Sequence, residues 1–305
     1  MKAIVTGGAG FIGSHLVDTL VTAGAKVHVI DNLATGSGEY INPGATFHFL
    51  DIRSQEAKDL ILRERPDAVF HQAAQVDVQR SIHDPGYDAQ VNIIGTVNVL
   101  EACRQASVKK IIYASSCAVY GDLNTDRITE DDPTDPISYY GVSKLTPEAY
   151  IRIFHRLYGL PYTILRYANV YGPRQTPKGE GGVVAIFLDR IKKGLPLRIH
   201  GDGEQTRDFV YVKDVVAANL AAFQHGKQDV IQVGTSTRTS INQVVRLLSK
   251  LHGTDLPVVY EQERPGDIKH SCLDNRKAYE KLGWQPKYDI VHGLEESYHL
   301  LMQEA

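Results

Sequence analysis

The stretch Thr6-Gly7-Gly8-Ala9-Gly10-Phe11-Ile12-Gly13 decides the fold of this chain. It follows a β-branched run, Lys2–Thr6, and leads into a segment of helical periodicity, Ile12–Ala23, so it forms a strand-to-helix junction. Its glycines fit both G-x-G-x-x-G and the wider G-x-x-G-x-x-G. Because glycine has no Cβ, the backbone can turn tightly and approach a phosphate, whose charge the helix N-terminus stabilises. The stretch therefore predicts a dinucleotide-binding loop.

Short strands and longer helices alternate through the first half of the chain. Helical periodicity marks Ile12–Ala23, Val91–Ala106 and Ser143–Tyr158. The alternation predicts an α/β fold, a Rossmann-type, doubly wound parallel sheet with helices on both faces. The acidic, proline-containing segment Asp122–Ser138 is predicted to be an exposed excursion rather than core. The predicted buried strands are Lys2–Thr6, Lys26–Ile30, Thr46–Leu50, Asp67–His71, Lys110–Ala114 and Tyr162–Arg166.

The sequence pattern changes after about residue 172. The segment Pro173–Gly182 is rich in Gly, Pro and charge, and shorter strands and helices follow it. We therefore expect a dinucleotide-binding domain over residues 1–172 and a smaller, mostly C-terminal α/β substrate lobe over residues 173–305. A segment near residues 210–235 can return to the first domain through a strand at Asp229–Val233.

Composition excludes several classes of protein. The 305 residues carry a formal net charge of −3, which argues against a nucleic-acid partner. No apolar run approaches the about 18 residues that cross a bilayer, and the N-terminus reads as a strand rather than a signal peptide. Three distant cysteines predict neither disulfides nor a zinc site, and the twelve histidines form no HExxH motif, so no catalytic metal is expected. We expect a soluble, cytoplasmic protein.

Two carboxylates follow predicted strands at the edge where the glycine loop lies. Asp31 ends the second strand, 18 residues after Gly13, where it can accept hydrogen bonds from adenosine ribose hydroxyls. The same carboxylate repels a 2′-phosphate, which favours NAD over NADP. Asp51, followed by Ile52, can bind the adenine amine or can instead cap the next helix.

A third group of residues predicts proton transfer. Tyr140 and Lys144 are four residues apart and share one helix face, while Ser115 and Ser116 end the fifth strand. Open α/β sheets bind ligands at this end of their strands. A tyrosine beside an ammonium group and a positive nicotinamide ring should have a lowered pKa, so it can act as a base toward a sugar hydroxyl. Ser116, Tyr140 and Lys144 are the predicted catalytic residues.

The ordered set of motifs resembles the extended short-chain dehydrogenases/reductases, specifically their nucleotide-sugar epimerase group and most closely the UDP-glucose 4-epimerase family. The resemblance extends over almost the whole chain. Its motifs are residues 6–13 quoted above, Asp31-Asn32-Leu33, His71-Gln72-Ala73-Ala74-Gln75, Ser115-Ser116-Cys117-Ala118-Val119-Tyr120-Gly121, Tyr140-x-x-x-Lys144, Arg166-Tyr167-Ala168-Asn169-Val170-Tyr171-Gly172-Pro173, Arg207-Asp208-Phe209-Val210 and Arg264-Pro265-Gly266-Asp267.

This resemblance implies roles for individual residues. Ser116 would hydrogen-bond the sugar 4-hydroxyl, Tyr140 would remove its proton, and Lys144 would hold the nicotinamide ribose and lower the tyrosine pKa. Arg207 and Arg264 would hold the diphosphate, which also makes chemical sense because a diphosphate needs charge-assisted donors. The implied NAD-binding residues are Gly7, Gly10, Phe11, Ile12, Gly13, Asp31, Asn32, Asp51, Ile52, Gln75, Asn92, Ser115, Tyr140, Lys144, Tyr167 and Val170. The implied substrate-binding residues are Ser116, Tyr140, Asn169, Val183, Ile199, His200, Arg207, Arg264, Asp267 and Ser271.

The residues before Val119-Tyr120-Gly121 bear on the reaction. Relatives that dehydrate or decarboxylate nucleotide sugars carry a carboxylate there, whereas this chain has Cys117-Ala118. Elimination needs a general acid, so the simplest remaining reaction is reversible oxidation at C4 of a UDP-hexose, with NAD staying bound. A 4,6-dehydratase or decarboxylase and a non-catalytic NAD-binding scaffold remain alternatives.

Substrate breadth and assembly depend on further positions. The residue four after Asp267 borders the sugar pocket in the family, and here it is the small Ser271, so we expect UDP-GlcNAc and UDP-GalNAc to be accepted beside UDP-glucose and UDP-galactose. His200 either touches the nucleotide base or is an ordinary strand residue. Family resemblance implies a homodimer, although the apolar stripes of Val91–Ala106 and Ser143–Tyr158 could equally pack on the core.

Overall fold

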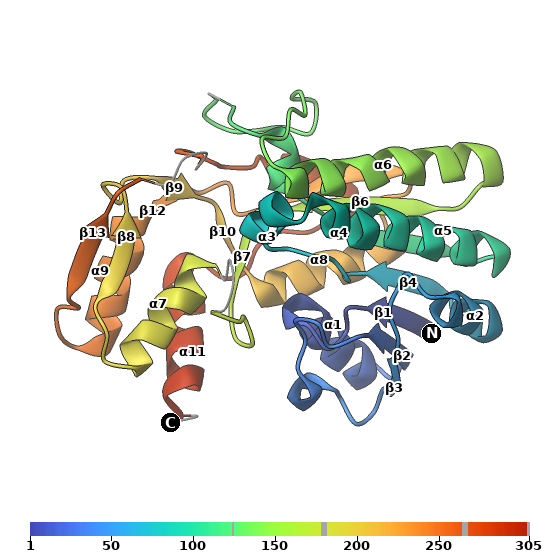
Figure 1. The fold of residues 1–305 in the computed structure, drawn as a ribbon, viewed down its shortest axis with the longest axis horizontal. Helices are drawn as coiled ribbons and strands as arrows, with labels where there is room; N and C mark the ends of the chain where they lie inside the picture. The colour runs from blue at the N-terminus through green and yellow to red at the C-terminus, as the bar shows by residue number, and fades with distance from the viewer. Residues whose placement is uncertain (124, 178–181, 264–267, 304–305) are drawn as a thin grey trace.

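A seven-stranded parallel sheet forms the larger part of the molecule (Figure 1). The computed structural model describes residues 1–123, 125–177, 182–263 and 268–303. The predicted fold class is confirmed, and each of the six predicted strands is present, Lys2–Thr6 with the predicted bounds and the others with one end shifted by one or two residues. Both faces are covered, which explains why the strands are nearly continuous apolar runs. In spatial order the strands are β11 (Asp229–Val233), β6 (Tyr162–Tyr167), β5 (Lys110–Ser116), β4 (Ala68–His71), β1 (Lys2–Thr6), β2 (Lys26–Asp31) and β3 (Thr46–Phe49).

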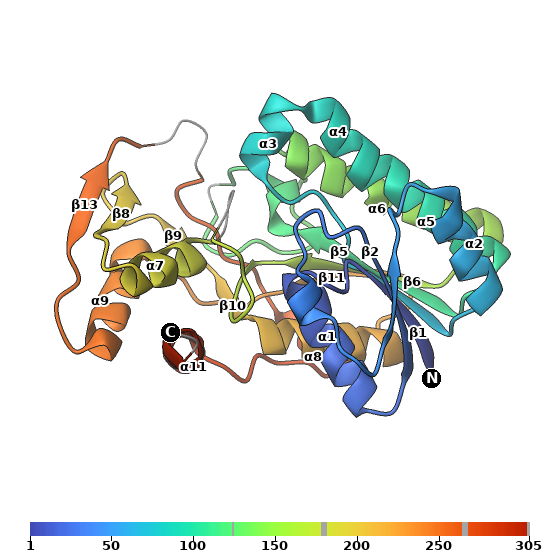
Figure 2. The ribbon, with the colours of Figure 1, turned by 60° about the horizontal axis from the view of Figure 1, so that its bottom comes forward.

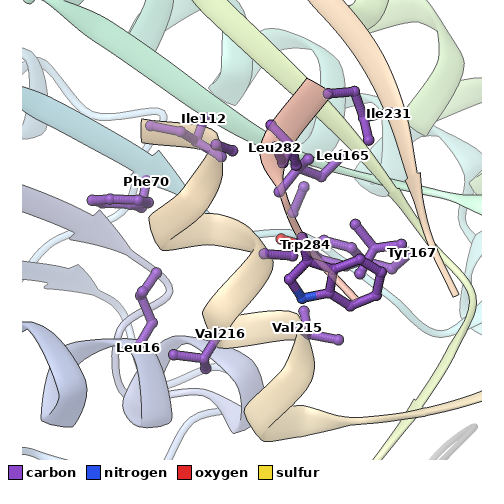
Figure 3. Packing of buried hydrophobic residues seen from close by; sticks show 14 of the residues in the cluster. Leu16, Phe70, Ile112, Leu165, Tyr167, Val215, Val216, Ile231, Leu282 and Trp284 are labelled. Carbon is purple, nitrogen blue, oxygen red and sulfur yellow. The ribbon is translucent and has the colours of Figure 1, made fainter. Parts of the chain in front are cut away.

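Helices cover both faces of this sheet (Figure 2). On one face, Val215 and Val216 of α8 pack against Phe70, Ile112 and Leu165 from three strands (Figure 3). On the other face, apolar residues of three helices form a second core. The first face carries α1 (Phe11–Thr22), α8 (Val212–Gln224) and α10 (Arg276–Leu282), and the second carries α2 (Gln55–Glu64), α5 (Gly95–Gln105) and α6 (Tyr139–Tyr158).

A smaller lobe lies beside the carboxyl edge of the sheet, to the left in Figure 1. Its own core includes Phe187, Val244 and Leu294, one from each of three helices. Three two-stranded sheets complete the lobe and its junction, pairing β8 with β13, β9 with β12 and β7 with β10. The elements are β7 (Asn169–Tyr171), α7 (Val183–Lys192), β8 (Leu197–His200), β9 (Thr206–Arg207), β10 (Phe209–Tyr211), β12 (Thr239–Ser240), α9 (Ile241–His252), β13 (Val258–Glu261) and α11 (Ile290–Gln303).

Two predicted helices differ from the observed ones. The predicted helix Val91–Ala106 is a π-helical segment, η2 (Gln90–Ile94), followed by α5, and the short helices α3 (Val78–His83) and α4 (Pro85–Ala89) precede it. The helix predicted from Ser143 begins at Tyr139, because the Ser138 hydroxyl caps it by accepting a hydrogen bond from the Gly141 N–H at 3.1 Å.

The segment Asp122–Ser138 also departs from its prediction. Ile128 is only 3% exposed and belongs to the core on the α8 face. Its N–H donates to the Cys272 carbonyl at 2.9 Å, and its carbonyl accepts from the Asp274 N–H at 2.7 Å. The exposed excursion was therefore a wrong prediction for Ile128, which two hydrogen bonds hold against the chain near Leu273. Among the described helices, none is both long and apolar enough to cross a bilayer.

Candidate functional site

The glycine loop joins β1 to α1 in a form that only glycine allows. Gly7 has φ +68°, and a Cβ there would lie 2.7 Å from the Ala73 backbone nitrogen. A Cβ on Gly13 would lie 2.0 Å from the Gly7 carbonyl oxygen. Gly10 caps α1 without a side chain, so the first-turn amides of Phe11, Ile12 and Gly13 face outward as donors. The loop has the shape and polarity of a phosphate cradle.

Asp31 braces this loop from the end of β2. Its Oδ2 accepts from the Ala9 N–H at 2.9 Å and its Oδ1 from the Leu33 N–H at 2.8 Å. The side chain is largely buried, and burial raises the pKa of the carboxyl group above its ordinary value. Each oxygen retains a lone pair that can accept a ribose hydroxyl.

Asp51 lies nearby, in the turn after β3. The Arg53 guanidinium contacts its two oxygens at 2.9 and 2.7 Å, and the Asn32 amide donates at 3.0 Å. The bonds from Arg53 lower the pKa of this carboxyl group. The alternative role of capping α2 is wrong for Asp51, because Ser54 is the cap. The Ile52 side chain is buried, and its carbonyl accepts from an asparagine amide of α5.

Gln75 and Asn92 form one buried hydrogen-bond group behind the loop that follows β4. The Gln75 N–H donates to Asn92 Oδ1 at 2.8 Å, and Asn92 Nδ2 donates to the Gln75 carbonyl at 2.9 Å. Asn92 also donates to Ser143 Oγ at 2.9 Å, and both side chains contact Asp88. These two predicted cofactor residues therefore tie the β4 loop to α6.

The three predicted catalytic residues are brought to one place. Ser116 ends β5, and its Oγ accepts from the Ala118 N–H at 3.2 Å. The first turn of α6 packs against the following short helix, η3 (Cys117–Tyr120), so closely that a Cβ on Gly141 would lie 2.6 Å from the Ala118 carbonyl oxygen. Tyr140 on this first turn, half-buried, thus lies on the helix end that meets the Ser116 loop.

Lys144 lies one turn further along α6 and is buried. Its Nζ is 4.7 Å from the centre of the Tyr113 ring. Burial lowers the pKa of its ammonium group to about 8, while Glu148 and Asp88 oppose that fall. The neighbouring His71 hydrogen-bonds Thr6 Oγ1 at 2.6 Å and Thr96 Oγ1 at 2.9 Å, and burial lowers its pKa to about 3, so its ring is neutral.

Sequence reasoning missed Glu148, which is fully buried one turn beyond Lys144. It accepts from Ser115 Oγ at 2.7 Å and from Arg166 at 2.9 and 2.7 Å. The predicted cofactor residue Ser115 thus points its hydroxyl at α6. A signal existed, because Glu148 repeats the four-residue spacing of Tyr140 and Lys144.

The end of β6 and β7 carry three further predicted residues. The buried Tyr167 hydroxyl donates to Asn219 Oδ1 at 3.1 Å and accepts from Gln72 Nε2 at 3.2 Å. Burial raises its pKa to about 12, so it stays neutral. Asn169 and Val170 lie in β7, beside β10, and the Asn169 N–H donates to the Asp208 carbonyl at 2.9 Å.

The substrate lobe presents Arg207 and Ser271 together. The Ser271 N–H donates to the Thr206 carbonyl at 3.2 Å, directly beside Arg207. Arg207 is half-buried, and Ser271 is 8% exposed. Burial and Asp208 raise the pKa of the Cys117 thiol to about 11, an effect that Arg207 opposes. Arg264 and Asp267 lie outside the described residues.

Asp208 was missed although its motif was recognised. The side chain is 1% exposed and accepts from Thr235 N–H and Oγ1 at 2.8 and 2.6 Å, and from the N–H groups of Ser236 and Leu273 at 3.2 Å each. Burial raises the pKa of this carboxyl group. It joins three loops behind Arg207, a role that sequence spacing could not reveal.

The other predicted substrate residues lie in the small lobe. Val183 is the first residue of α7 and is half-buried. The Ile199 side chain is 1% exposed within the core of the lobe. His200 ends β8, with Nδ1 3.5 Å from Glu261 Oε2. In the described part of the chain, no three His, Cys, Asp or Glu side chains group as metal ligands would.

Comparisons with known proteins agree with this geometry. The sequence model described as the NAD dependent epimerase/dehydratase family matches residues 3–234. A UDP-glucose 4-epimerase from Thermotoga maritima, solved with UDP-glucose, is 46% identical with a TM-score of 0.97, covering 100% of this chain and 99% of that one. A Thermus thermophilus UDP-glucose 4-epimerase, solved with NAD, is 41% identical with a TM-score of 0.94, covering 100% of both chains. A UDP-N-acetylglucosamine 4-epimerase from Methanobrevibacter ruminantium, in complex with UDP-N-acetylmuramic acid, is 36% identical with a TM-score of 0.95, covering 100% and 99%.

Proposed function

The chain belongs to the NAD-dependent epimerase/dehydratase family, and from this premise we propose that it is an NAD-dependent 4-epimerase of UDP-hexoses. It interconverts UDP-galactose and UDP-glucose. The observation that carries this function is the packing of the helix end bearing Tyr140 and Lys144 on the Ser116 loop, at the carboxyl edge of the sheet. Relatives that are similar over their full length are named for the same reaction.

The residues present fit NAD. The cradle that a Cβ at Gly7 or Gly13 would fill, with the open amides of α1 beside it, suits the pyrophosphate. Asp31 suits the adenosine ribose, and its charge disfavours a 2′-phosphate. Asn32, Asp51 and Ile52 border the adenine, while the groups around Gln75, Asn92, Tyr167 and Val170 shape the nicotinamide end.

The reaction inverts C4 by removing and returning hydrogen. Bound NAD supplies the hydride acceptor and donor. Ser116 orients the sugar 4-hydroxyl, and Tyr140, as phenolate, takes its proton while the hydride leaves C4. Lys144 holds the nicotinamide ribose, and its ammonium charge favours the phenolate. The 4-keto sugar then turns about its link to the diphosphate and presents its other face. Tyr140 would return the proton to the 4-oxygen as the hydride returns to C4.

The small lobe holds the nucleotide during this rotation. Arg207, with Arg264, binds the diphosphate by charge-assisted hydrogen bonds, and Asn169 and Asp267 complete the contacts to UDP. Val183, Ile199 and His200 border the base, where Ile199 contributes backbone because its side chain is in the core. We assign the NAD half to residues 1–172 with a return near 210–235, and the nucleotide-sugar half to residues 173–305. The pairing of β11 with β6 supports that return, and α10, which packs on the α8 face of the sheet, is assigned to the NAD half as well.

One assay tests the function. Purified protein is incubated with UDP-galactose and no added NAD, and UDP-glucose should form because the cofactor stays bound. Absence of UDP-glucose, with bound NAD confirmed by its spectrum, contradicts the proposal. A 4-keto-6-deoxy product or release of CO₂ would instead identify a dehydratase or decarboxylase. Cys117-Ala118 stands where such enzymes carry an acid.

Substrate breadth follows from Ser271. Its small side chain beside Arg207 leaves room for an N-acetyl group, so we propose that UDP-GlcNAc and UDP-GalNAc are also epimerised. Ser271→Tyr should lower activity on the N-acetylated pair relative to UDP-galactose. An unchanged ratio of the two activities contradicts this role, and Ser236→Ala, outside the proposed sugar contacts, is the control.

The proposed homodimer uses an apolar face of α6. Tyr150, Ile153, Leu157 and Tyr158 are exposed by 41, 49, 65 and 53%, spaced along one side of the helix. A face of this kind suits pairing with a second copy of the same helix. Light scattering should give twice the mass of one chain, and Leu157→Glu should halve it. A monomeric wild type contradicts the dimer.

The proposed location is the cytoplasm, and the proposed metabolic context is galactose metabolism. All three cysteines are unpaired, as expected in a reducing compartment. Cell fractionation followed by the epimerase assay tests the location.

A further inference from the structure

The buried Glu148 carboxylate joins the middle of α6 to the carboxyl ends of β5 and β6. On β5 it accepts from Ser115 Oγ, and on β6 it receives Arg166 through a two-point contact at 2.9 and 2.7 Å. Ser115 and Arg166 are themselves paired in the sheet register. The carboxylate therefore fixes the position of α6 relative to the strand that carries Ser116.

The guanidinium of Arg166 extends this contact to the far side of Ser116. Its Nη1 donates to the Tyr120 hydroxyl at 2.7 Å, and Gln232 Nε2 donates to the same hydroxyl at 2.6 Å. Ser115 and Tyr120 flank the loop that begins at Ser116, and one buried ion pair immobilises both. Two-point arginine–carboxylate contacts give such geometric specificity.

Glu148 also faces Lys144 along α6, since residues four apart share a helix face. Asp88 also acts on this ammonium, the neutral His71 lies within its influence, and the Tyr113 ring lies 4.7 Å from its Nζ. Burial lowers the Lys144 pKa to about 8. Glu148 and Asp88 both oppose this lowering, and the effect of Glu148 is the larger.

We propose that Glu148 is a positioning residue of the epimerase site: its carboxylate holds Ser116 and the catalytic helix in register and keeps Lys144 charged. This inference rests on the proposed roles of Ser116, Tyr140 and Lys144. It assigns Glu148 no contact with substrate or cofactor.

Glu148→Gln in the holoenzyme tests the inference. We expect kcat for UDP-galactose to fall about tenfold or more with KM nearly unchanged, because register and not binding is affected. The alkaline limb of the kcat profile should move down by about one pH unit, because Lys144 loses an opposing charge. A merely structural role would lower stability and leave the profile in place.

Matched variants separate position from charge. Ser115→Ala removes one hydrogen bond and no charge, so kcat should fall a few-fold without a shift of the alkaline limb. Arg152→Ala removes only a 3.5 Å contact to the same carboxylate and should leave both unchanged. Glu148→Gln leaves Arg166 buried without its partner, so the single variant could fail to fold. In that case the double variant Glu148→Gln/Arg166→Met replaces it in the test, because proteins tolerate neutral replacement of a buried ion pair.

A readout independent of activity completes the test. With ¹⁵N-labelled lysine, the Lys144 Nζ resonance is assigned by its loss in Lys144→Arg and followed from pH 6 to 10. A lower titration midpoint in the Glu148 variant supports the inference. An unchanged midpoint together with an unchanged kcat profile overturns it. If the wild type fails to epimerise, the proposed function fails, while the titration still decides whether Glu148 acts on Lys144.

Discussion

Two buried carboxylates border the candidate site and are held in different ways. Glu148 lies on the side of the reacting groups and is bound by the Arg166 guanidinium and one hydroxyl. Asp208 lies on the side of the substrate lobe, and its hydrogen-bond partners among the described residues are neutral donors, namely three N–H groups and one hydroxyl. We call the side of the site that holds Glu148 the catalytic wall, and the side that holds Asp208 the substrate wall.

The difference shows how each wall meets the cost of burying charge. A full countercharge fixes Glu148, and its removal would leave an arginine buried alone. Hydrogen bonds to loop backbone fix Asp208, whose pKa stays raised by burial. We therefore expect changes in the catalytic wall to act on rate, and changes in the substrate wall to act on stability, pH response and affinity.

The largest expected effect is on the catalytic wall. Tyr140→Phe removes the proposed base and should lower kcat by about 10²–10⁴-fold, with little change in KM. The measurement is the rate of UDP-galactose conversion by holoenzyme. Tyr139→Phe, a neighbour that is 54% exposed, is the matched control and should keep its activity. Comparable rates in the two variants would remove Tyr140 from the mechanism.

The next effect is on the stability of the substrate wall. Asp208→Asn places an amide donor against two of the four donors, the Thr235 pair on Oδ1 or the Ser236 and Leu273 N–H groups on Oδ2, and should lower the free energy of unfolding by about 3 kcal/mol. Urea denaturation measures this change. Asp202→Asn, an exposed turn aspartate with one N–H donor, should change stability by less than about 1 kcal/mol. Equal losses in the two variants contradict the bracing role of Asp208.

The same pair of proteins tests the pH response. The folded-state pKa of Asp208 is above its ordinary value of 3.8, so the folded protein binds this proton more tightly than the unfolded chain. Asp208 therefore contributes its full stabilisation when the pH is below its ordinary pKa of 3.8, and this stabilisation is lost as the pH rises through the folded-state pKa. The stability advantage of the wild type over Asp208→Asn should therefore grow from pH 7 toward pH 4. A constant advantage would show that the group does not titrate in this window.

A smaller effect is expected on affinity. Arg207→Ala should raise KM for UDP-galactose about tenfold, because it removes roughly one charge-assisted hydrogen bond to the substrate. It should change kcat less. Steady-state kinetics measures both. Arg198→Ala in the same lobe removes an exposed arginine 3.4 Å from Glu261 and should leave KM unchanged. A fall in kcat alone would move Arg207 to the catalytic wall.

The smallest effect concerns the second arginine at Glu148. Arg152 is 39% exposed and 3.5 Å from the carboxylate. Exposed pairs contribute little, so Arg152→Ala should cost less than about 1 kcal/mol in thermal or urea unfolding. A large loss would mean that Glu148 depends on both arginines.

The sequence predicted the sheet and the glycine loop because local patterns carry them. Lys2–Thr6 and the glycines after it are contiguous, and β-branched runs mark buried strands wherever they occur. The end of β5 at Ser115-Ser116 and the shared helix face of Tyr140 and Lys144 were also predictable, since strand ends and four-residue spacing are local features.

The remainder depended on contacts between distant residues. The π-helical turn contains Asn92, whose side chain is hydrogen-bonded to Gln75 and Ser143. Hydrophobic periodicity carries no information about these bonds. Ile128 is buried by a bridge to Leu273, although it lies in a polar stretch with Asp126 and Glu130 two residues to either side. Asp208 gains its donors from two distant segments, Thr235-Ser236 and Leu273, that only the folded chain brings together.

The return of the chain through β11 limits how this protein can be divided. β11 protects the hydrogen-bonding edge of β6, and α8, on the preceding segment, covers Phe70, Ile112 and Leu165. A fragment that stops at residue 172 would expose the unpaired edge of β6 and the apolar surface that α8 covers, and both promote aggregation. An engineer who wishes to exchange substrate lobes between relatives must therefore splice the gene at several points, keeping α8, β11 and α10 with the sheet they cover.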